Sequence, residues 1–223
     1  MTRAEMLAEL REVIDETTTQ YAWTESTLLG YLAEGQDRFC ERTGYFMDIL
    51  STPITLSTGV AIYAIPDRVI QIQDIFNGTK KLGKFQEDDR SKLTNDWTQF
   101  DDPETTGVPT AWQTDRESGY ITLDKTPTAD EDGDTLTLRV WRYSSTALDA
   151  SGGEPEIPDR FHRACIEWAA YKAYMHHDEE QQDPVKAGDH LRAFEDYTQQ
   201  GHTAMRRYHG VETRVGTSQA YRT

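Results

Sequence analysis

The chain has 223 residues with a formal net charge of −16, and 36% of its residues are hydrophobic. A chain of this length removes roughly 70% of its unfolded surface from water on folding, and its five Trp and eleven Tyr argue against general disorder. The acidic balance argues against a protein that grips DNA, RNA or anionic lipid over a broad surface.

Two helices are predicted at the N-terminal end. A capping box that begins at Thr2, followed by apolar residues at helical spacing, predicts a helix over residues 3 to 18. Thr24 or Ser26 is expected to cap a second helix, and Gly44 favours the left-handed conformation that ends one. The expected core-facing stripe of this second helix consists of Leu28, Leu32 and Phe39.

Strand patterns dominate the middle of the chain. Apolar and polar residues alternate from Ile54 onward, in runs separated by Gly, Pro, Asn or Asp. The clearest run is "YAIPDRVIQIQDIFNGTKKL", residues 63–82, in which Asn77-Gly78 predicts the tight turn of an antiparallel hairpin. Residues 84–109 are polar with isolated aromatics and are expected to form a long loop or short irregular elements.

Helical patterns return after the Gly/Pro-rich linker of residues 149–158. Asp159 is expected to cap a helix that contains Phe161 and Cys165. The pair Asp183-Pro184 predicts the start of a further helix, which is expected to end near Gly210.

The order of these elements predicts an α+β fold. Four main helices from both ends of the chain are expected to form a helical bundle with an inserted antiparallel β lobe and an extended C-terminal tail. The expected domains are residues 1–48 with 158–209 for the bundle, 49–157 for the β-rich lobe and 210–223 for the arm.

No pattern in the sequence builds a catalytic, cofactor or metal site, so we expect neither an enzyme nor a bound cofactor. In "HHDEE", residues 176–180, neighbouring side chains on a helix point about 100° apart and cannot converge on one ion. "DEDGD", residues 130–134, lacks the rest of a calcium loop. His162 lies three residues before Cys165, but a packed thiol is a better interpretation than a thiol-base pair.

The two cysteines and the hydropathy pattern suggest where the protein is made. Cys40 and Cys165 lie in apolar helical patterns, which favours two buried thiols in a reducing compartment. No apolar run approaches membrane-spanning length, and the first residues lack the apolar core of a signal peptide. We therefore expect a cytosolic protein that does not enter membranes.

The last residues differ in charge from the rest of the chain. Residues 205–223 contain four arginines and one glutamate, a local charge of +3. Such a segment could dock on an acidic partner, add as a strand to an exposed sheet edge, or serve only as a solubility tail.

Several phrases, taken in order, resemble a known family. "YAIPDRVIQIQDIFNGTKKL", "GVPTAWQTD", "YITLDKTPTADEDGDTLTLRVW" and "EIPDRFHRACIEWAAYKAY" are similar to segments of the head-to-tail adaptor (connector) proteins of tailed bacteriophages, over roughly residues 20 to 200. The resemblance implies a structural protein of the virion neck, made in the host cytoplasm. It implies a homo-oligomeric ring, usually a dodecamer, which lies beneath the portal protein, joins the capsid to tail or nozzle proteins and lets double-stranded DNA pass without specific binding.

The resemblance also gives the C-terminal tail a role, because the extended C-terminus of such adaptors commonly reaches into the portal ring. The residues expected to bind the portal are Arg206, Arg207, Tyr208, Arg214, Val215, Tyr221 and Arg222.

Two other functions stay open at this point: a tail-completion or gatekeeper component, and a carbohydrate-binding or glycan-active protein. The second would need aromatics of the β-rich region to line a sugar platform, although core packing is their commoner use. Those aromatics are Tyr63, Trp97, Trp112, Tyr120, Trp141 and Tyr143.

Overall fold

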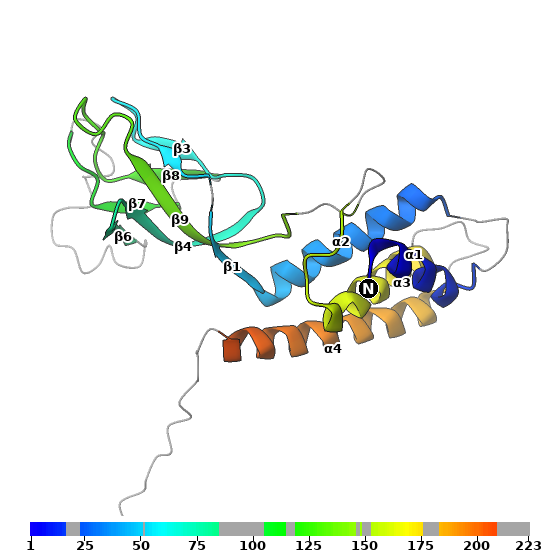
Figure 1. The fold of residues 1–223 in the computed structure, drawn as a ribbon. Helices are drawn as coiled ribbons and strands as arrows, with labels where there is room; N and C mark the ends of the chain where they lie inside the picture. Colours follow the sequence, from blue (N-terminus) through cyan, green and yellow to red (C-terminus); the bar gives the residue numbers. More distant parts are fainter. Residues whose placement is uncertain are drawn as a thin grey trace, which may run out of the picture. The chain divides into compact units, whose positions relative to one another are not determined.

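The structure is a computed structural model that describes residues 1–16, 23–50, 52–84, 105–114, 119–145, 148, 153–175 and 183–208. These residues form four α-helices and two β-sheets, so the predicted α+β fold with four main helices is confirmed (Figure 1). The chain divides into two compact units, a helical unit of Met1–Tyr45 with Ser144–Thr223 and a β unit of Phe46–Tyr143. The predicted tail of residues 210–223 lies outside the described residues.

The helical unit contains one 3₁₀ turn besides its α-helices. Its elements are α1 (Arg3–Val13), α2 (Glu25–Thr43), η3 (Asp159–Phe161), α3 (His162–Met175) and α4 (Pro184–Tyr208).

Helix α1 begins as predicted but ends earlier. The capping box is present: the Thr2 side chain accepts from the Glu5 backbone N–H, and the Glu5 carboxylate accepts from the Thr2 N–H. The helix ends at Val13 instead of residue 18, because Asp15 adopts a left-handed φ of 60°. The Glu16 N–H then donates to the carbonyl of Arg11 (2.8 Å), which completes a Schellman motif without glycine.

Helix α2 has the predicted ends. Thr24 is its N-cap, and its side chain accepts from the backbone N–H of Thr27 (3.2 Å). Gly44 closes the helix with a left-handed φ of 57°. The predicted stripe is fully buried; it consists of Leu28, Leu32 and Phe39.

The start of α3 differs from the prediction. Asp159 does not cap an α-helix: it begins the 3₁₀ turn η3, whose N-cap is Pro158 and has no side-chain capping bond. Pro158 holds an extended conformation, and the Asp159 carboxylate is exposed. The α-helix begins only at His162.

Helix α3 is the core of its unit. It contacts α1, α2 and α4, and most of its residues are buried. A helix enclosed on several sides needs small residues where its neighbours approach closely. Four alanines provide this room: Ala164, Ala169, Ala170 and Ala173.

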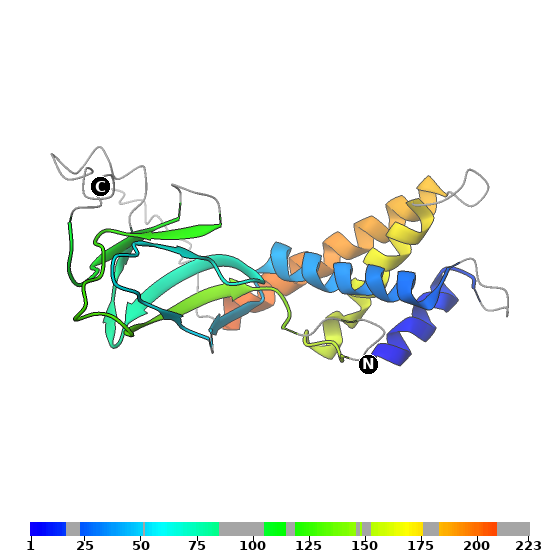
Figure 2. The ribbon, with the colours of Figure 1, turned by 90° about the horizontal axis from the view of Figure 1, so that it is seen from above.

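Two glycines allow the helices to approach one another. A Cβ on Gly35 of α2 would lie 3.0 Å from the Cα and carbonyl oxygen of Cys165 in α3. Gly201 of α4 lies even closer to α2, which crosses α4 in the view of Figure 2. The start of α4 is as predicted, since the Asp183 carboxylate accepts from the N–H groups of Val185 and Lys186.

The β unit contains two sheets. Its strands are β1 (Phe46–Ile49), β2 (Ile54–Thr55), β3 (Ile62–Ala64), β4 (Val69–Asn77), β5 (Lys80–Lys81), β6 (Gly83–Lys84), β7 (Ala111–Gln113), β8 (Tyr120–Leu123) and β9 (Thr135–Arg142). One sheet has the order β1-β9-β4-β5 with β2 also on β9, and the other has the order β3-β8-β7-β6. All described pairs are antiparallel except β6 with β7.

The hairpin predicted from the sequence is confirmed. Strands β4 and β5 pair Phe76 with Lys81 and Asn77 with Lys80, and Gly78 in the turn has a φ of 57°. Strand β1 was missed, because residues 46–48 were assigned to the helical part of the chain. It pairs antiparallel with β9, Phe46 lying opposite Arg142.

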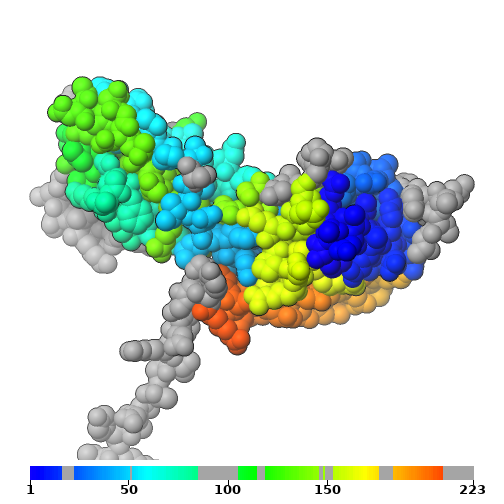
Figure 3. Space-filling model, in the orientation of Figure 1, coloured from blue at the N-terminus to red at the C-terminus, as the bar shows by residue number. Residues whose placement is uncertain are grey.

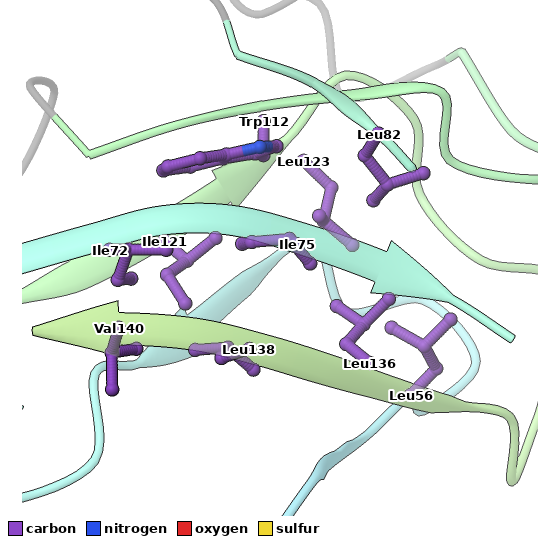
Figure 4. Packing of buried hydrophobic residues seen from close by; sticks show 10 residues of the cluster. All are labelled: Leu56, Ile72, Ile75, Leu82, Trp112, Ile121, Leu123, Leu136, Leu138 and Val140. Atoms are coloured by element: carbon purple, nitrogen blue, oxygen red, sulfur yellow. The ribbon is translucent and has the colours of Figure 1, made fainter. Parts of the chain in front are cut away.

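The core of the β unit lies between its two sheets. Inward-facing residues of β4 and β9 meet those of β7 and β8 there (Figure 4). The cluster consists of Leu56, Ile72, Ile75, Leu82, Trp112, Ile121, Leu123, Leu136, Leu138 and Val140.

Candidate interaction surfaces

The residues predicted to bind the portal begin at the end of α4. Arg206 and Arg207 are exposed in its last turn, where cations also complement the helix dipole, and Tyr208 is its last residue. The structure therefore brings these three together at one helix end. The others of the set lie outside the described residues; they are Arg214, Val215, Tyr221 and Arg222.

A basic groove lies beside this helix end. It has a volume of about 330 Å³ and is lined by Arg160, Phe161, Gln199, Gln200, Thr203, Ala204 and Arg207. The guanidinium of Arg160 lies over the Phe161 ring (4.7 Å) and donates to the Tyr45 hydroxyl (3.3 Å), so its position is fixed by two contacts. Two cations from separate elements thus face one groove with side-chain amides on its wall.

An acidic groove lies along α1. It has a volume of about 750 Å³ and is lined by Met1, Glu5, Ala8, Glu9, Glu12, Val13 and Arg163. Glu5, Glu9 and Glu12 are four and three residues apart, a spacing that places their side chains on one helix face. We call these two features the basic groove and the acidic groove.

The acidic groove is backed by an ionic network across three helices. The Arg163 guanidinium in α3 donates to Glu9 of α1 and, through Nε, to Oε1 of Glu167 (2.6 Å). The other Glu167 oxygen lies 2.6 Å from Nδ1 of His190 in α4, whose ring stacks on Tyr174. Burial opposes the charge on Arg163, but its bonds to the two carboxylates outweigh burial and raise its pKa.

The two grooves flank the start of α3. Arg160 and Phe161, just before α3, line the basic groove together with α4, while Arg163, in its first turn, lines the acidic groove together with α1. In the space-filling view, the yellow residues at the start of α3 lie between blue α1 and the orange-red end of α4 (Figure 3).

The linker before α3 is fixed to α2. The backbone N–H of Glu156 donates to the buried side chain of Gln36 (3.1 Å). The Glu156 carboxylate accepts from the Ser144 hydroxyl and from the backbone N–H of Ser145 (2.6 Å). These bonds hold Glu156, near the end of the Gly/Pro-rich linker, against α2 and against the residues that precede the linker.

The β unit exposes an apolar sheet edge at β3. The N–H of Leu123 in β8 donates to the Ala61 carbonyl, and the N–H of Ile65 donates to the Gly119 carbonyl. The intervening Ile62 and Ala64 therefore direct their backbone groups away from β8. Ile62 is 46% exposed, and Tyr120 on β8 is 38% exposed. The predicted strand addition of the tail to such an edge stays a prediction.

The remaining sequence candidates have structural explanations. Cys40 and Cys165 are free and buried, as predicted, and burial raises the pKa of the Cys165 thiol. His162 is buried, and its Nε2 lies 2.7 Å from the carbonyl oxygen of Ile157, which provides a hydrogen bond within the linker. The "HHDEE" segment lies outside the described residues.

The "DEDGD" loop is held by its own hydrogen bonds. Glu131 accepts from the Thr128 hydroxyl (2.5 Å) and the Thr128 N–H (2.7 Å), and these bonds lower its pKa. Asp132 accepts from the backbone N–H of Thr58 (2.9 Å). Glu131 therefore holds the loop internally, and Asp132 fixes it to the turn at Thr58.

Three of the aromatics proposed for a sugar platform have separate structural roles within the described part of the chain. Trp112 is completely buried in the core, and the Tyr63 hydroxyl donates to the carbonyl of Val60 (2.8 Å). Tyr143 lies under the Arg68 guanidinium, and Trp97 is outside the described residues.

Two residues of the grooves were missed in the sequence. Both Arg160 and Glu12 fall within predicted helices, and neither carries a local signal of binding. Only the folded chain brings Arg160 beside Arg207, 47 positions apart in the printed sequence.

Among the described residues, no group of three His, Cys, Asp or Glu side chains could hold a metal ion. In the same part of the chain, no helix combines the length and apolar character needed to cross a membrane.

Comparison with known proteins gives one result for almost the whole chain. A family model described as "SU10 adaptor protein" matches residues 1–219. No curated protein matches the chain.

Proposed function

The chain belongs to the SU10 adaptor protein family, a phage head-tail adaptor family, and on this basis we propose that it forms a ring beneath the portal, joins the capsid to the tail and lets DNA pass. The match over residues 1–219 is the observation that carries the proposal, because it includes both structural units. The proposed location is the neck of the virion, after synthesis in the host cytoplasm.

The charge of the chain supports a passive channel for DNA. A wall rich in Lys and Arg would bind phosphates tightly and in a salt-dependent way. A protein with a net charge of −16 repels the duplex, so DNA could slide past without adhering.

We propose that the arm of residues 210–223 attaches the subunit to the portal. Arg206, Arg207 and Tyr208 form its base, and Arg214, Val215, Tyr221 and Arg222 lie along it. Ordering an extended segment costs roughly 1–2 kcal/mol of backbone entropy per residue, so one arm binds weakly. Repeated arms around a ring raise one another's effective concentration and together give durable attachment.

The domain division is part of the same proposal. The helical domain consists of residues 1–48 and 158–209, and the β-rich domain of residues 49–157. The separate apolar core of the β unit supports the view that each domain folds around its own core.

Truncation after Tyr208 tests the attachment. We expect the truncated protein to keep the circular dichroism and melting behaviour of the full chain but to dissociate from purified portal rings, and filled heads to leak DNA. The matched control replaces residues 209–223 with a Gly/Ser segment of equal length, which keeps the length but not the side chains. Full retention on portal by either variant would refute the role of the arm.

A further inference from the structure

The two grooves of the helical unit carry opposite charge and lie on the same chain. We propose that they bind each other between copies, so that the basic groove of one subunit receives the acidic face of α1 from its neighbour. This inference rests on the proposed ring and deepens it by naming the surfaces that would join the subunits.

The basic groove has charge available for a partner. Arg207 is exposed and, among the residues that the structure describes, has no ion-pair partner. Arg160 is already positioned by Tyr45 and Phe161, so binding would restrict it little further. A carboxylate that entered this groove would meet both guanidinium groups, and Arg binds carboxylates in a directional, two-pronged way.

The acidic groove has the complementary charge. Glu12 is exposed and has no ion-pair partner within the described ranges. Arg163 also lines this groove, but Glu9 and Glu167 already engage its guanidinium. The carboxylate of Glu12 is therefore the group in this groove best placed to meet an incoming arginine.

A second copy fits these charges better than DNA does. Duplex phosphates would be attracted to Arg160 and Arg207, but a chain with a net charge of −16 repels DNA as a whole. Phosphates also cannot pair with the Glu12 carboxylate, because both groups are negative. A second copy satisfies both grooves at once. Because the two surfaces differ, the contact is heterologous, and its repetition closes into a ring when the rotation between copies allows.

In this arrangement Arg207, which the sequence predicts to bind the portal, contacts the neighbouring subunit instead. Residues beyond Tyr208 remain with the portal.

Charge reversal on portal rings tests the contact. Native mass spectrometry would count the subunits on each portal ring when adaptor is added below saturation. Contacts between neighbours make loading cooperative, so wild type should give mainly full and empty portals. Arg207→Glu alone and Glu12→Arg alone should each give intermediate numbers and require at least about tenfold more protein to fill a ring.

Mixing the two variants supplies the decisive result. In alternating order, the unaltered Arg207 of one variant meets the unaltered Glu12 of the other, and the two reversed charges also meet as opposites. The mixture should therefore restore full and empty portals. Two control variants, Arg192→Glu and Glu25→Arg, make the same charge changes at exposed residues outside both grooves and should load as wild type does.

The outcomes separate the two proposals. If wild type binds no portal at all, the proposed function fails and the inference fails with it. If wild type loads cooperatively and both single variants do the same, or if mixing restores nothing, the inference is overturned while the adaptor function stands.

Discussion

Gly201 in α4 lies directly against the ring of Phe39 in α2: a Cβ atom on Gly201 would come within 2.5 Å of Phe39 Cζ and 2.9 Å of Thr43 Cγ2. The ring cannot easily move aside, because it is completely buried and packs on Phe161 with 5.0 Å between ring centroids. This contact fixes how closely the two helices approach.

Gly201→Ala should therefore destabilise the protein by about 1–3 kcal/mol, the usual cost of overpacking a core. Gly188→Ala in the same helix is the matched control, since its Cβ would meet nothing within 4 Å. It should stabilise the protein by up to about 1 kcal/mol, because alanine favours the helix over glycine. Urea denaturation measures both changes, and equal effects would contradict the close packing.

Loss of Glu167 should lower the free energy of unfolding far more than loss of a surface ion pair does. Its carboxylate is buried between Arg163 and His190, so Glu167→Ala leaves two polar groups without their partner. We expect a loss of roughly 3 kcal/mol. Arg192→Ala removes an exposed pair with Asp189 of similar length (3.0 Å) and should change the free energy of unfolding by less than about 1 kcal/mol. Similar effects in the two variants would count against the network.

The two thiols should be unreactive in the folded protein. Cys40 and Cys165 are buried, and a raised pKa keeps Cys165 in its less reactive thiol form. A thiol-specific chromogenic reagent should label neither cysteine under native conditions and both in guanidinium chloride. Rapid native labelling of one equivalent would show that α2 and α3 separate often.

The stability of the "DEDGD" loop should depend on acid pH. Hydrogen bonds from Thr128 lower the pKa of Glu131 in the folded state. The stabilisation is therefore complete above the pKa of the unfolded chain, near 4.3, and is lost as pH falls through the lower pKa of the folded state. Denaturation midpoints of Glu131→Gln should be less sensitive to pH in this range than those of wild type. An unchanged pH dependence would mean that Glu131 makes no such contribution.

Salt should reveal the charges of the arm. If Arg214 and Arg222 pair with portal carboxylates, replacing both with Ala should weaken attachment most at low salt, where charges are least screened. The difference in affinity between variant and wild type should shrink as salt rises. Salt screens the attraction between these arginines and the portal carboxylates in wild type, and the variant lacks that attraction at any salt concentration. Surface plasmon resonance on immobilised portal would measure this, and a difference independent of salt would point to packing instead of charge.

The elements that could be predicted are those with a local cause. Thr24, Gly44 and Asp183 mark helix ends because their own side chain or backbone makes the cap, and Asn77-Gly78 similarly identifies the hairpin. Asp15 could not be foreseen as a helix end, since a left-handed aspartate is uncommon and glycine is the usual signal.

Features that depend on distant contacts were missed for a different reason. Strand β1 has four residues and forms because β9, about ninety residues later, provides its partners. Arg160 and Arg207 line the same groove only after α3 and α4 pack together. No sequence pattern around either arginine indicates this groove. The sequence also does not show that Gly201 allows α4 to approach α2 closely, because a glycine in a helical pattern usually indicates only a weaker helix.

The helical unit is assembled from both ends of the chain, and this has a consequence during synthesis. Helices α1 and α2 leave the ribosome before any residue of α3, because all strands of the β unit lie between them. At about 5–20 residues per second, that interval lasts on the order of ten seconds. For this time Leu28, Leu32 and Phe39 lack the helix that buries them, so the nascent chain, more than the finished protein, needs protection by chaperones.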